Sequence, residues 1–301
     1  MDYKQFDEFC LKNNIEFKID EPMKLHTTFK IGGAADRFIT VKADNLIKVI
    51  SEIKRCEFPF FILGKGSNLL VSDKGIEGVV ISVLQMNEIS VEGEFITAGA
   101  GASLAAVCTT ALENGLTGLE FAYGIPGSVG GALYMNAGAY GGEMSQVVFS
   151  AECLSENLET KRLSAEQMQL GYRTSVFKSN GDIITSITFK LEHGEKEKIR
   201  DAMEDYLSRR KSKQPLDFPS AGSTFKRPTG YFAGALIEQN NLKGFSVGGA
   251  MVSEKHAGFV INYDNATCGD VRNLMKQVAD KVLKENGVAL EPEIIFVGRE
   301  N

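Results

Sequence analysis

Two glycine-rich segments constrain this chain more than any other feature of its sequence. The first, GKGSNLLVSD (residues 64–73), lies between the apolar runs PFFIL and GVVISV. The second, GIPGSVGGALYMNAGAYGGE (residues 124–143), belongs to a stretch in which nine of the 31 glycines fall between Gly115 and Gly142. Glycine permits positive φ angles and close approach to the main chain, at a cost in backbone entropy. Such a density predicts neither a helix nor an ordinary strand.

The first segment has the chemistry of an anion site. Successive backbone N–H groups in a glycine turn form a concave donor surface, and Ser67 and Asn68 add side-chain donors. The segment is not a GxxxxGK[ST] loop, and Leu69 stands where GxGxxG needs its third glycine. Taken alone, the first segment has an alternative explanation as a tight turn between strands. The second, taken alone, has an alternative explanation as a place of close helix–strand packing. One long ligand lying along both segments explains the pair better.

Composition narrows the class of protein. The chain has 301 residues, 43% apolar and 24% charged, which is typical of a soluble protein of more than one domain. A net charge of −6 argues against nucleic-acid and anionic-membrane partners. No apolar run approaches the roughly 20 residues that span a bilayer, and the polar start MDYKQFDEFC is not a signal peptide. We therefore expect a cytoplasmic protein without a membrane partner.

Cysteine and histidine usage excludes two further kinds of site. The five cysteines are widely spaced and contain no CxxC, which indicates a reducing compartment and no disulfide framework. The three histidines are scattered, without an HExxH or a zinc spacing. We predict no metal site.

Hydrophobic periodicity predicts a mixed α+β chain. Asp44 is a candidate N-cap, Ser103 begins a helix that ends at Gly115, and Gly287 ends another. The expected helices cover residues 3–13, 44–56, 103–114, 195–213, 230–240 and 270–286, and the expected strands cover 59–63, 79–84, 183–191, 258–263 and 294–297.

Both glycine segments resemble the FAD-binding domain of the vanillyl-alcohol-oxidase-type (PCMH-type) flavoproteins. Further segments narrow the resemblance to the UDP-N-acetylenolpyruvoylglucosamine reductase family of bacterial cell-wall synthesis, and they occur in order from residue 26 to 298. They are HTTFKIGGAADRF (26–38), GYRTSVFK (171–178), SAGSTFKRP (220–228), GGAMVSEKHAGFVIN (248–262) and LEPEIIFVG (290–298).

The resemblance implies a fold and a domain plan. The fold is α+β, with a two-subdomain PCMH-type FAD-binding domain and a C-terminal α+β substrate-binding domain. We expect FAD-binding subdomain 1 at residues 1–80, subdomain 2 at 81–205 and the UDP-sugar domain at 206–291. The tail, 292–301, is expected to pack back on subdomain 1.

The resemblance also implies an activity. It is the NADPH-dependent, FAD-mediated reduction of UDP-N-acetylglucosamine enolpyruvate to UDP-N-acetylmuramate, in peptidoglycan precursor synthesis. We expect FAD to be non-covalent, because no motif for covalent attachment occurs. The expected partner is a small nucleotide-sugar, and a monomer is expected although no sequence feature specifies the oligomeric state.

Three residues correspond to the family's catalytic residues. Hydride addition to an enolpyruvate leaves negative charge that must be stabilised and then protonated. The resemblance implies that Ser223 donates the proton and that Arg173 and Glu293 stabilise the enolate. Glu293 competes with Glu291 in EPE, and the family pattern favours Glu293. Without the resemblance, each has a commoner explanation as a surface ion pair, a turn serine or a solvated carboxylate.

The remaining binding residues are also implied by the resemblance. Substrate contacts are expected from Tyr172, Lys226 and His256, for which a packed aromatic, a surface cation and a polar-turn histidine are the alternatives. The expected FAD-binding residues are Gly64, Lys65, Gly66, Ser67, Asn68, Leu69, Ile125, Pro126, Gly127, Ser128, Gly131, Asn136, Ala137 and Gly138.

The chain departs from the family pattern at two points. Only 49 residues separate Arg173 from Ser223, so the chain resembles the branch that lacks an inserted tyrosine loop. Ile295 stands where some members carry an arginine near the flavin, so no flavin contact is expected there. Two other functions stay open: an oxygen-using FAD oxidase of the same fold, and a non-catalytic binder of flavin or nucleotide sugar.

Overall fold

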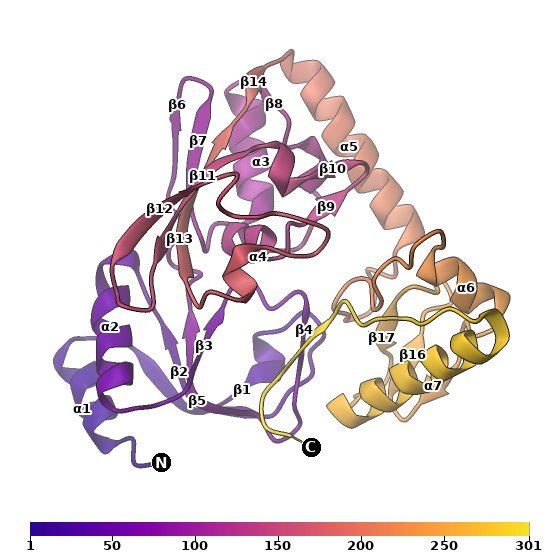
Figure 1. The fold of residues 1–301 in the computed structure, drawn as a ribbon, viewed down its shortest axis with the longest axis horizontal. Coiled ribbons are helices and arrows are strands. Elements are labelled where there is room, and N and C mark those ends of the chain that lie inside the picture. Colours follow the sequence, from indigo (N-terminus) through magenta and orange to yellow (C-terminus); the bar gives the residue numbers. More distant parts are fainter. Residues whose placement is uncertain (301) are drawn as a thin grey trace. The chain divides into compact units, whose positions relative to one another are not determined.

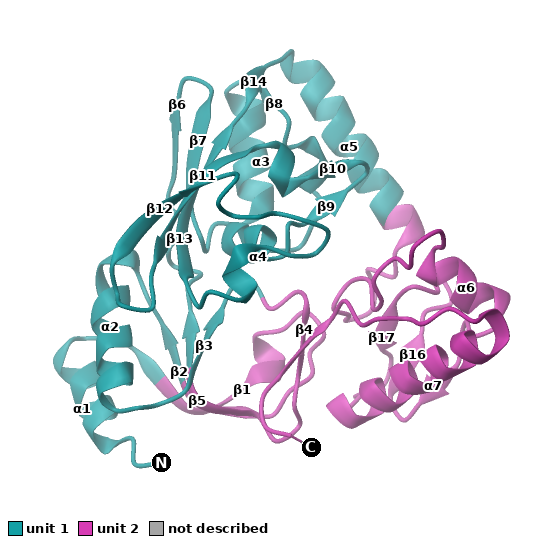
Figure 2. Cartoon of the chain, in the orientation of Figure 1, with its two compact units in different colours: residues 1–17, 38–65, 80–210 teal, residues 18–37, 66–79, 211–301 magenta. Residues whose placement is uncertain are grey.

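The computed structural model describes residues 1–300 (Figure 1). The chain divides into two compact units, each assembled from separate stretches of sequence (Figure 2). The first unit contains residues 1–17, 38–65 and 80–210, and the second contains 18–37, 66–79 and 211 onward. The functional division at residues 80, 205 and 291 follows other boundaries and stays a prediction.

The first unit is built on a five-stranded antiparallel sheet with strand order β12-β11-β13-β7-β6. Apolar residues alternate along its strands and bury one face, so that Ile96, Ala98, Ile187 and Phe189 are fully buried. Helices α3 and α4 pack against β7. The bounds are β6 Ile89–Glu92, β7 Phe95–Gly99, β11 Val148–Leu154, β12 Thr160–Ser164, β13 Ile183–Lys190, α3 Leu104–Glu113 and α4 Val129–Tyr134.

A second sheet, formed by strands from the first 82 residues, has four strands in the order β1-β2-β5-β3. Strands β2 and β5 each begin in the second unit and end in the first. The apolar stripe of α2 places Leu46, Val49, Ile50 and Ile53 in the core. The bounds are α1 Lys4–Lys12, β1 Phe17–Pro22, β2 Ala34–Thr40, α2 Ala43–Arg55, β3 Phe60–Leu63 and β5 Ile76–Ser82.

In the second unit α7 packs on a three-stranded antiparallel sheet, β15-β16-β17, and α6 packs on α7. Four α7 residues at helical spacing, Val271, Leu274, Val278 and Val282, are fully buried in its core. In the same unit β18 pairs with β4 in parallel. The bounds are β4 Leu69–Val71, α6 Ala233–Gln239, β15 Ser246–Val247, β16 Ala250–Val252, β17 Val260–Asn262, α7 Cys268–Asn286 and β18 Ile295–Val297.

Four further strands are short: β8 Leu116–Thr117, β9 Gly138–Ala139, β10 Gly142–Glu143 and β14 Glu192–His193. The helix α5, Lys196–Lys213, is long, with 18 residues.

All six expected helices and all five expected strands are present, with ends shifted by a few residues. One capping prediction is wrong: Lys42 is the N-cap of α2, without a side-chain hydrogen bond, and Asp44 lies in the first helical turn. The expectation of no helix in the second glycine segment is also wrong, because α4 contains Gly130. A β-carbon there would come 2.9 Å from the Cβ of Ala100, so close packing supports the helix.

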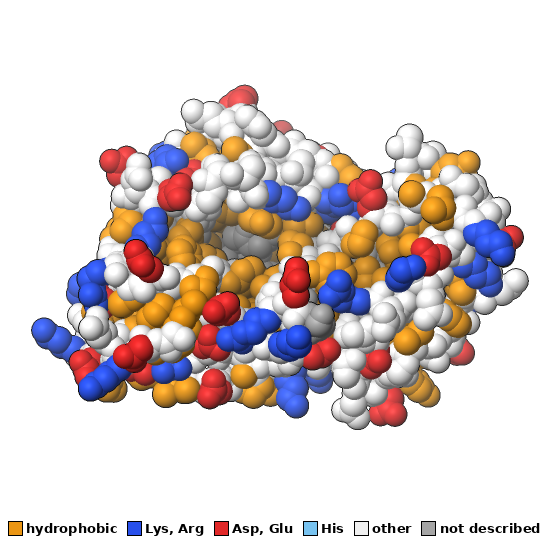
Figure 3. Space-filling model, turned by 60° about the horizontal axis from the view of Figure 1, so that its bottom comes forward, with side chains coloured by type: hydrophobic (Ala, Val, Ile, Leu, Met, Phe, Trp, Pro, Cys, Tyr) orange, Lys and Arg blue, Asp and Glu red, His pale blue; other side chains and the backbone are white. Residues whose placement is uncertain are grey.

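Within residues 1–300, no helix is both long and apolar enough to cross a membrane. Acidic and basic side chains are interspersed on the face drawn in Figure 3, without a large area of one sign.

The N-terminus of α7 gives a test of the second unit's stability. Thr267 Oγ1 accepts a hydrogen bond from Asp270 N at 3.0 Å, and Asp270 Oδ2 accepts one from Thr267 N at 2.9 Å. Loss of the N-cap hydroxyl in Thr267→Ala should lower the free energy of unfolding by about 1 kcal/mol. Urea unfolding measures this, and Thr267→Ser is the matched control, expected to retain most of the stability. Equal stability of Thr267→Ala and wild type would contradict it.

Candidate functional site

The two glycine segments touch in the first unit. Gly64 follows β3, and a β-carbon added at Gly64 would lie 2.2 Å from Ser128 Oγ. Only glycine permits this approach. The structure therefore brings the first residue of one segment against the fifth residue of the other, as the prediction of a shared ligand requires.

Residue 66 also has to be glycine. Its φ angle is +62°, and a β-carbon there would lie 2.2 Å from the carbonyl oxygen of His26. The amide groups of Lys65, Gly66, Ser67 and Asn68 donate to no acceptor in the described part of the chain. Consecutive unused N–H donors in a turn suit a phosphate group. This loop therefore fits the diphosphate of a dinucleotide.

The second segment is used partly for packing. The amides of Val129 and Gly130 both donate to main-chain oxygens, those of Ala102 and Ala100, at 2.8 Å. By contrast, the amides of Gly127 and Ser128 have no acceptor among residues 1–300. Close packing and available donors thus occur side by side in this segment.

Asn136, a predicted cofactor residue, also links two segments of the chain through its side-chain hydrogen bonds. It is 1% exposed and has a φ angle of +43°. Its Oδ1 accepts from Ser145 N at 2.9 Å, and its Nδ2 donates to Gly171 O at 3.0 Å. A buried amide needs such partners. Asn136 therefore fixes the start of the segment that carries Tyr172 and Arg173.

Arg173 lies in a tight turn of the first unit. Gly171 and Thr174 exchange backbone hydrogen bonds of 3.1 and 3.2 Å, which leaves Tyr172 and Arg173 at the tip. Arg173 has a φ angle of +56°, and its carbonyl oxygen accepts from Lys178 Nζ at 2.8 Å. Its guanidinium carbon lies 5.3 Å from the centre of the Tyr172 ring. The turn presents the cation together with an exposed aromatic ring.

Thr224 organises the candidate site in the second unit. It is buried, its N–H donates to Gly258 O at 2.9 Å, and its Oγ1 accepts from Val260 N at 2.8 Å. Its carbonyl oxygen accepts from Glu293 N at 2.9 Å. Ser223, the preceding residue, is exposed and has no hydrogen-bond partner in the described chain. Sequence analysis had no signal for Thr224 beyond its place in AGSTF.

Glu293 also contacts the first glycine segment. Asn68 Nδ2 donates to Glu293 O at 3.1 Å, and Ile295 N donates to Asn68 O at 2.9 Å where β18 joins β4. Glu293 is therefore held between Asn68 and the Ser223–Thr224 loop. Three predicted residues, Asn68, Ser223 and Glu293, share one place in this unit.

Lys226 contacts Glu291, one of the two glutamates of the EPE sequence. Its Nζ lies 3.1 Å from Glu291 Oε2, and its N–H donates to Glu291 O at 2.8 Å. Glu291 is thus the ion-pair partner of Lys226, on an exposed surface where such pairs add little stability. Glu293 instead donates its N–H to the carbonyl oxygen of Thr224, next to Ser223. The choice of Glu293 as the catalytic glutamate stays a prediction.

His256 is half-buried in the same unit. Its Nδ1 accepts from Gly258 N at 3.1 Å, and its ring meets Phe259 edge-on at 5.0 Å. Burial lowers the pKa of His256, so the ring is neutral at physiological pH and carries its proton on Nε2. His256 can donate one hydrogen bond to a ligand.

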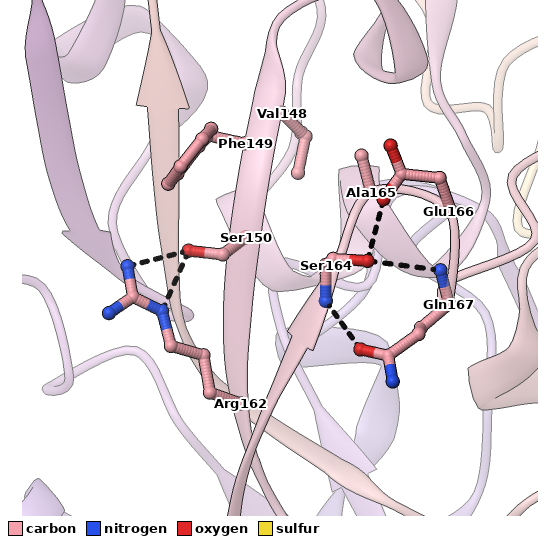
Figure 4. A pocket seen from close by; sticks show the side chains of 8 residues that line it. All are labelled: Val148, Phe149, Ser150, Arg162, Ser164, Ala165, Glu166 and Gln167. Atoms are coloured by element: carbon pink, nitrogen blue, oxygen red, sulfur yellow. Dashed lines mark hydrogen bonds between the residues drawn. The ribbon is translucent and has the colours of Figure 1, made fainter.

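Two pockets lie away from these residues. One, of about 390 Å³, opens beside β11 and β12, and Arg162 Nε and Nη2 donate there to Ser150 Oγ (Figure 4). The other, of about 380 Å³, is lined by residues that include Lys24, Lys30 and Tyr263. Neither contains a predicted site residue. Among residues 1–300, no group of three or more His, Cys, Asp or Glu is placed to hold a metal ion.

The contact between Gly64 and Ser128 can be tested through the cofactor. In Gly64→Ala, the new β-carbon collides with Ser128 Oγ and separates the two glycine segments. FAD retained after purification, measured from the flavin absorbance per protein, should fall. The control is the double variant Gly64→Ala/Ser128→Ala, which removes the colliding oxygen and should regain FAD. Full FAD content in Gly64→Ala alone would show that the contact does not matter for the cofactor.

Comparison with known proteins identifies the family. Residues 38–164 match the sequence family of an FAD binding domain. Residues 214–297 match the family of the UDP-N-acetylenolpyruvoylglucosamine reductase C-terminal domain. Curated reductases of that name are 49% identical in Clostridium perfringens (strain SM101 / Type A) and 50% identical in Clostridium botulinum (strain Hall / ATCC 3502 / NCTC 13319 / Type A). These alignments cover 99% of this chain and 98% and 97% of the relatives.

Solved structures agree with this result. The crystal structure of UDP-N-acetylenolpyruvylglucosamine reductase from Thermus caldophilus matches with a TM-score of 0.80 and 34% identity, over 94% of this chain and 98% of that one. The predicted family resemblance and the predicted α+β fold class are confirmed. The chain belongs to the UDP-N-acetylenolpyruvoylglucosamine reductase family.

Proposed function

We propose that this chain reduces UDP-N-acetylglucosamine enolpyruvate to UDP-N-acetylmuramate, with NADPH as reductant and FAD as cofactor. The observation that carries this function is full-length similarity, at 49% identity, to curated reductases of that name. The match to an FAD binding domain makes the chain an FAD-dependent oxidoreductase. The two glycine segments, which touch at Gly64 and Ser128, supply donors suited to a dinucleotide.

When bound, FAD would supply the redox chemistry of hydride transfer between NADPH and the enolpyruvyl substrate. The amides of Lys65, Gly66, Ser67 and Asn68 would hold its diphosphate, assisted by those of Gly127 and Ser128. The remaining predicted FAD-binding residues stay a proposal.

Ser223 is the proposed proton donor to the enolate-like carbon. A serine hydroxyl is a weak acid, so it serves only a strongly basic acceptor such as a carbanion. Its exposure supports this role, as does the absence of any hydrogen-bond partner for it in residues 1–300. Thr224 fixes the backbone of the loop, so that the hydroxyl is available without the loop being loose.

Glu293 and Arg173 are proposed to stabilise the charge that develops. Glu293 is held beside Ser223 by the bonds of its backbone to Thr224 and Asn68. Arg173 would bind the substrate carboxylate bidentately, because a guanidinium stays charged at any working pH and matches a carboxylate in geometry. Tyr172, Lys226 and His256 are proposed substrate contacts, and Lys226 would exchange Glu291 for an anionic substrate group.

The cellular setting follows from the reaction. We propose peptidoglycan precursor synthesis in the cytoplasm, with consequences for cell shape and division, by a monomer acting on a small nucleotide sugar. The wide spacing of the five cysteines, with no CxxC among them, supports a reducing compartment.

Anaerobic flavin spectroscopy tests the reaction directly. NADPH should bleach the flavin absorbance of the purified protein, and UDP-N-acetylglucosamine enolpyruvate should then restore it without oxygen. Recovery only on admission of air, with no response to the nucleotide sugar, would favour an oxidase of the same fold. A protein that binds UDP-sugar without either half-reaction would be a non-catalytic binder.

Replacement of Ser223 separates proton delivery from flavin reduction. Ser223→Ala should slow product formation by about 10²–10⁴-fold, because general acid catalysis is typically worth that much. Bleaching by NADPH should keep the wild-type rate. Ser223→Cys keeps a proton donor and should retain more activity than Ser223→Ala. Loss of both half-reactions in Ser223→Ala would contradict the assigned role.

A further inference from the structure

Thr28 connects the first glycine segment to the loop that carries Ser223. Its N–H donates to the carbonyl oxygen of Gly66 at 3.2 Å, and its Oγ1 donates to the carbonyl oxygen of Ser220 at 2.7 Å. The second bond joins residues that are 192 positions apart in the sequence. All four residues belong to the second unit. The proposed function gives Thr28 no role, although it contacts both the proposed phosphate-binding loop and the loop of the proposed proton donor.

The loop of Ser223 is held on both sides of the serine. On its C-terminal side, the hydrogen bonds of Thr224 fix the backbone. On its N-terminal side, the carbonyl oxygen of Ser220 accepts the bond described above, and Ala221 is buried. Between these two sides, Gly222 has a φ angle of +79°, and apart from its chain neighbours no atom lies within 4 Å of the position of an added β-carbon. The position of the exposed Ser223 hydroxyl therefore depends on the residues that hold the two sides.

The neighbouring Thr27 bonds locally instead. Its side chain is buried, and its Oγ1 donates to the carbonyl oxygen of Ile31, four residues along the same segment, at 3.2 Å. A threonine hydroxyl that only stabilises its own turn bonds in this local way. The hydroxyl of Thr28 makes a shorter bond, and its acceptor lies in another segment. The direction of this bond therefore indicates a role in positioning the Ser223 loop.

We propose that Thr28 is a positioning residue for proton delivery. Its hydroxyl holds the Ser223 loop against the first glycine segment, where the diphosphate of FAD is proposed to bind. Without this bond the loop would shift, and the Ser223 hydroxyl would move away from the substrate carbon that it protonates. A misplacement of about 1 Å can cost about 10²-fold in rate. This inference rests on the proposed function and adds one residue to it.

Anaerobic stopped-flow spectroscopy tests the role of the hydroxyl. Thr28→Val keeps the shape of the side chain and the N–H bond to Gly66 but removes the bond to Ser220. In this variant, reoxidation of the NADPH-reduced flavin by UDP-N-acetylglucosamine enolpyruvate should slow by at least about fivefold. The FAD content and the rate of bleaching by NADPH should stay as in wild type. Thr28→Ser keeps the hydroxyl and should restore most of the reoxidation rate.

The adjacent threonine supplies the matched control. Thr27→Val makes the same chemical change one residue earlier, where the hydroxyl bonds only to Ile31, and should reoxidise the flavin at the wild-type rate. Urea unfolding compares the stability of the two variants. Thr28→Ala serves as the test if Thr28→Val does not fold.

A double-mutant cycle shows whether Thr28 acts through Ser223. In the Ser223→Ala background no hydroxyl remains to be positioned, so Thr28→Val should cause no further loss of the reoxidation rate. A purely structural role would lower the rate by the same factor in both backgrounds.

Five results would overturn the inference. They are a wild-type reoxidation rate in Thr28→Val, an equal loss in Thr27→Val, no recovery in Thr28→Ser, the same factor of loss with and without Ser223, and release of FAD from Thr28→Val, which would assign Thr28 to the flavin. The proposed function fails in a different way. Absence of reoxidation by the enolpyruvyl substrate in wild type itself would remove the reaction, and this inference with it.

Discussion

The pairing of β18 with β4 is the constraint on which the second unit's site depends. These two strands are more than 220 residues apart in the sequence, yet Ile295 lies opposite Leu69 in a parallel register. Their backbone groups satisfy one another, and this holds Asn68 against Glu293. Thr224 extends the arrangement, because its hydrogen bonds join Glu293 to the strand that begins at Val260. Ser223 is therefore presented from a rigid frame of buried backbone bonds.

In the first unit, the two glycine segments are positioned by close contacts at glycine residues. Gly64 lies against Ser128, and Gly130 lies against Ala100, at distances that exclude a β-carbon. The glycine segments therefore have two roles. Some of their amides donate hydrogen bonds to the main chain, while others have no acceptor within residues 1–300 and are available to a ligand. These glycines lose more backbone entropy on folding than other residues would. In return they permit close contacts that a residue with a β-carbon would prevent.

Some polar side chains of this protein are buried and hydrogen-bonded within it, and others have no partner within residues 1–300 and are available to a ligand. Asn136 and Thr224 are buried and fully engaged, as buried polar groups must be. Ser223 lacks such a partner within residues 1–300, and it precedes Thr224, whose hydrogen bonds fix the loop. Binding and catalysis need this combination, because a donor that is already satisfied inside the protein has little to offer a ligand.

The sequence by itself determined the α+β class, the helices and strands with strong periodicity, and the family, because motif order and hydrophobic spacing are local properties of the chain. The family pattern predicts that Glu293 rather than Glu291 is the catalytic glutamate, and this stays a prediction. Only the tertiary structure decided that Gly64 meets Ser128, that Asn136 braces the Arg173 turn, and that Thr224 joins Ser223 to Glu293. The α4 helix was missed because tertiary packing on Ala100 outweighs the low helix propensity of glycine. Contacts between residues remote in sequence depend on how strands pair and helices pack, and no local pattern records that.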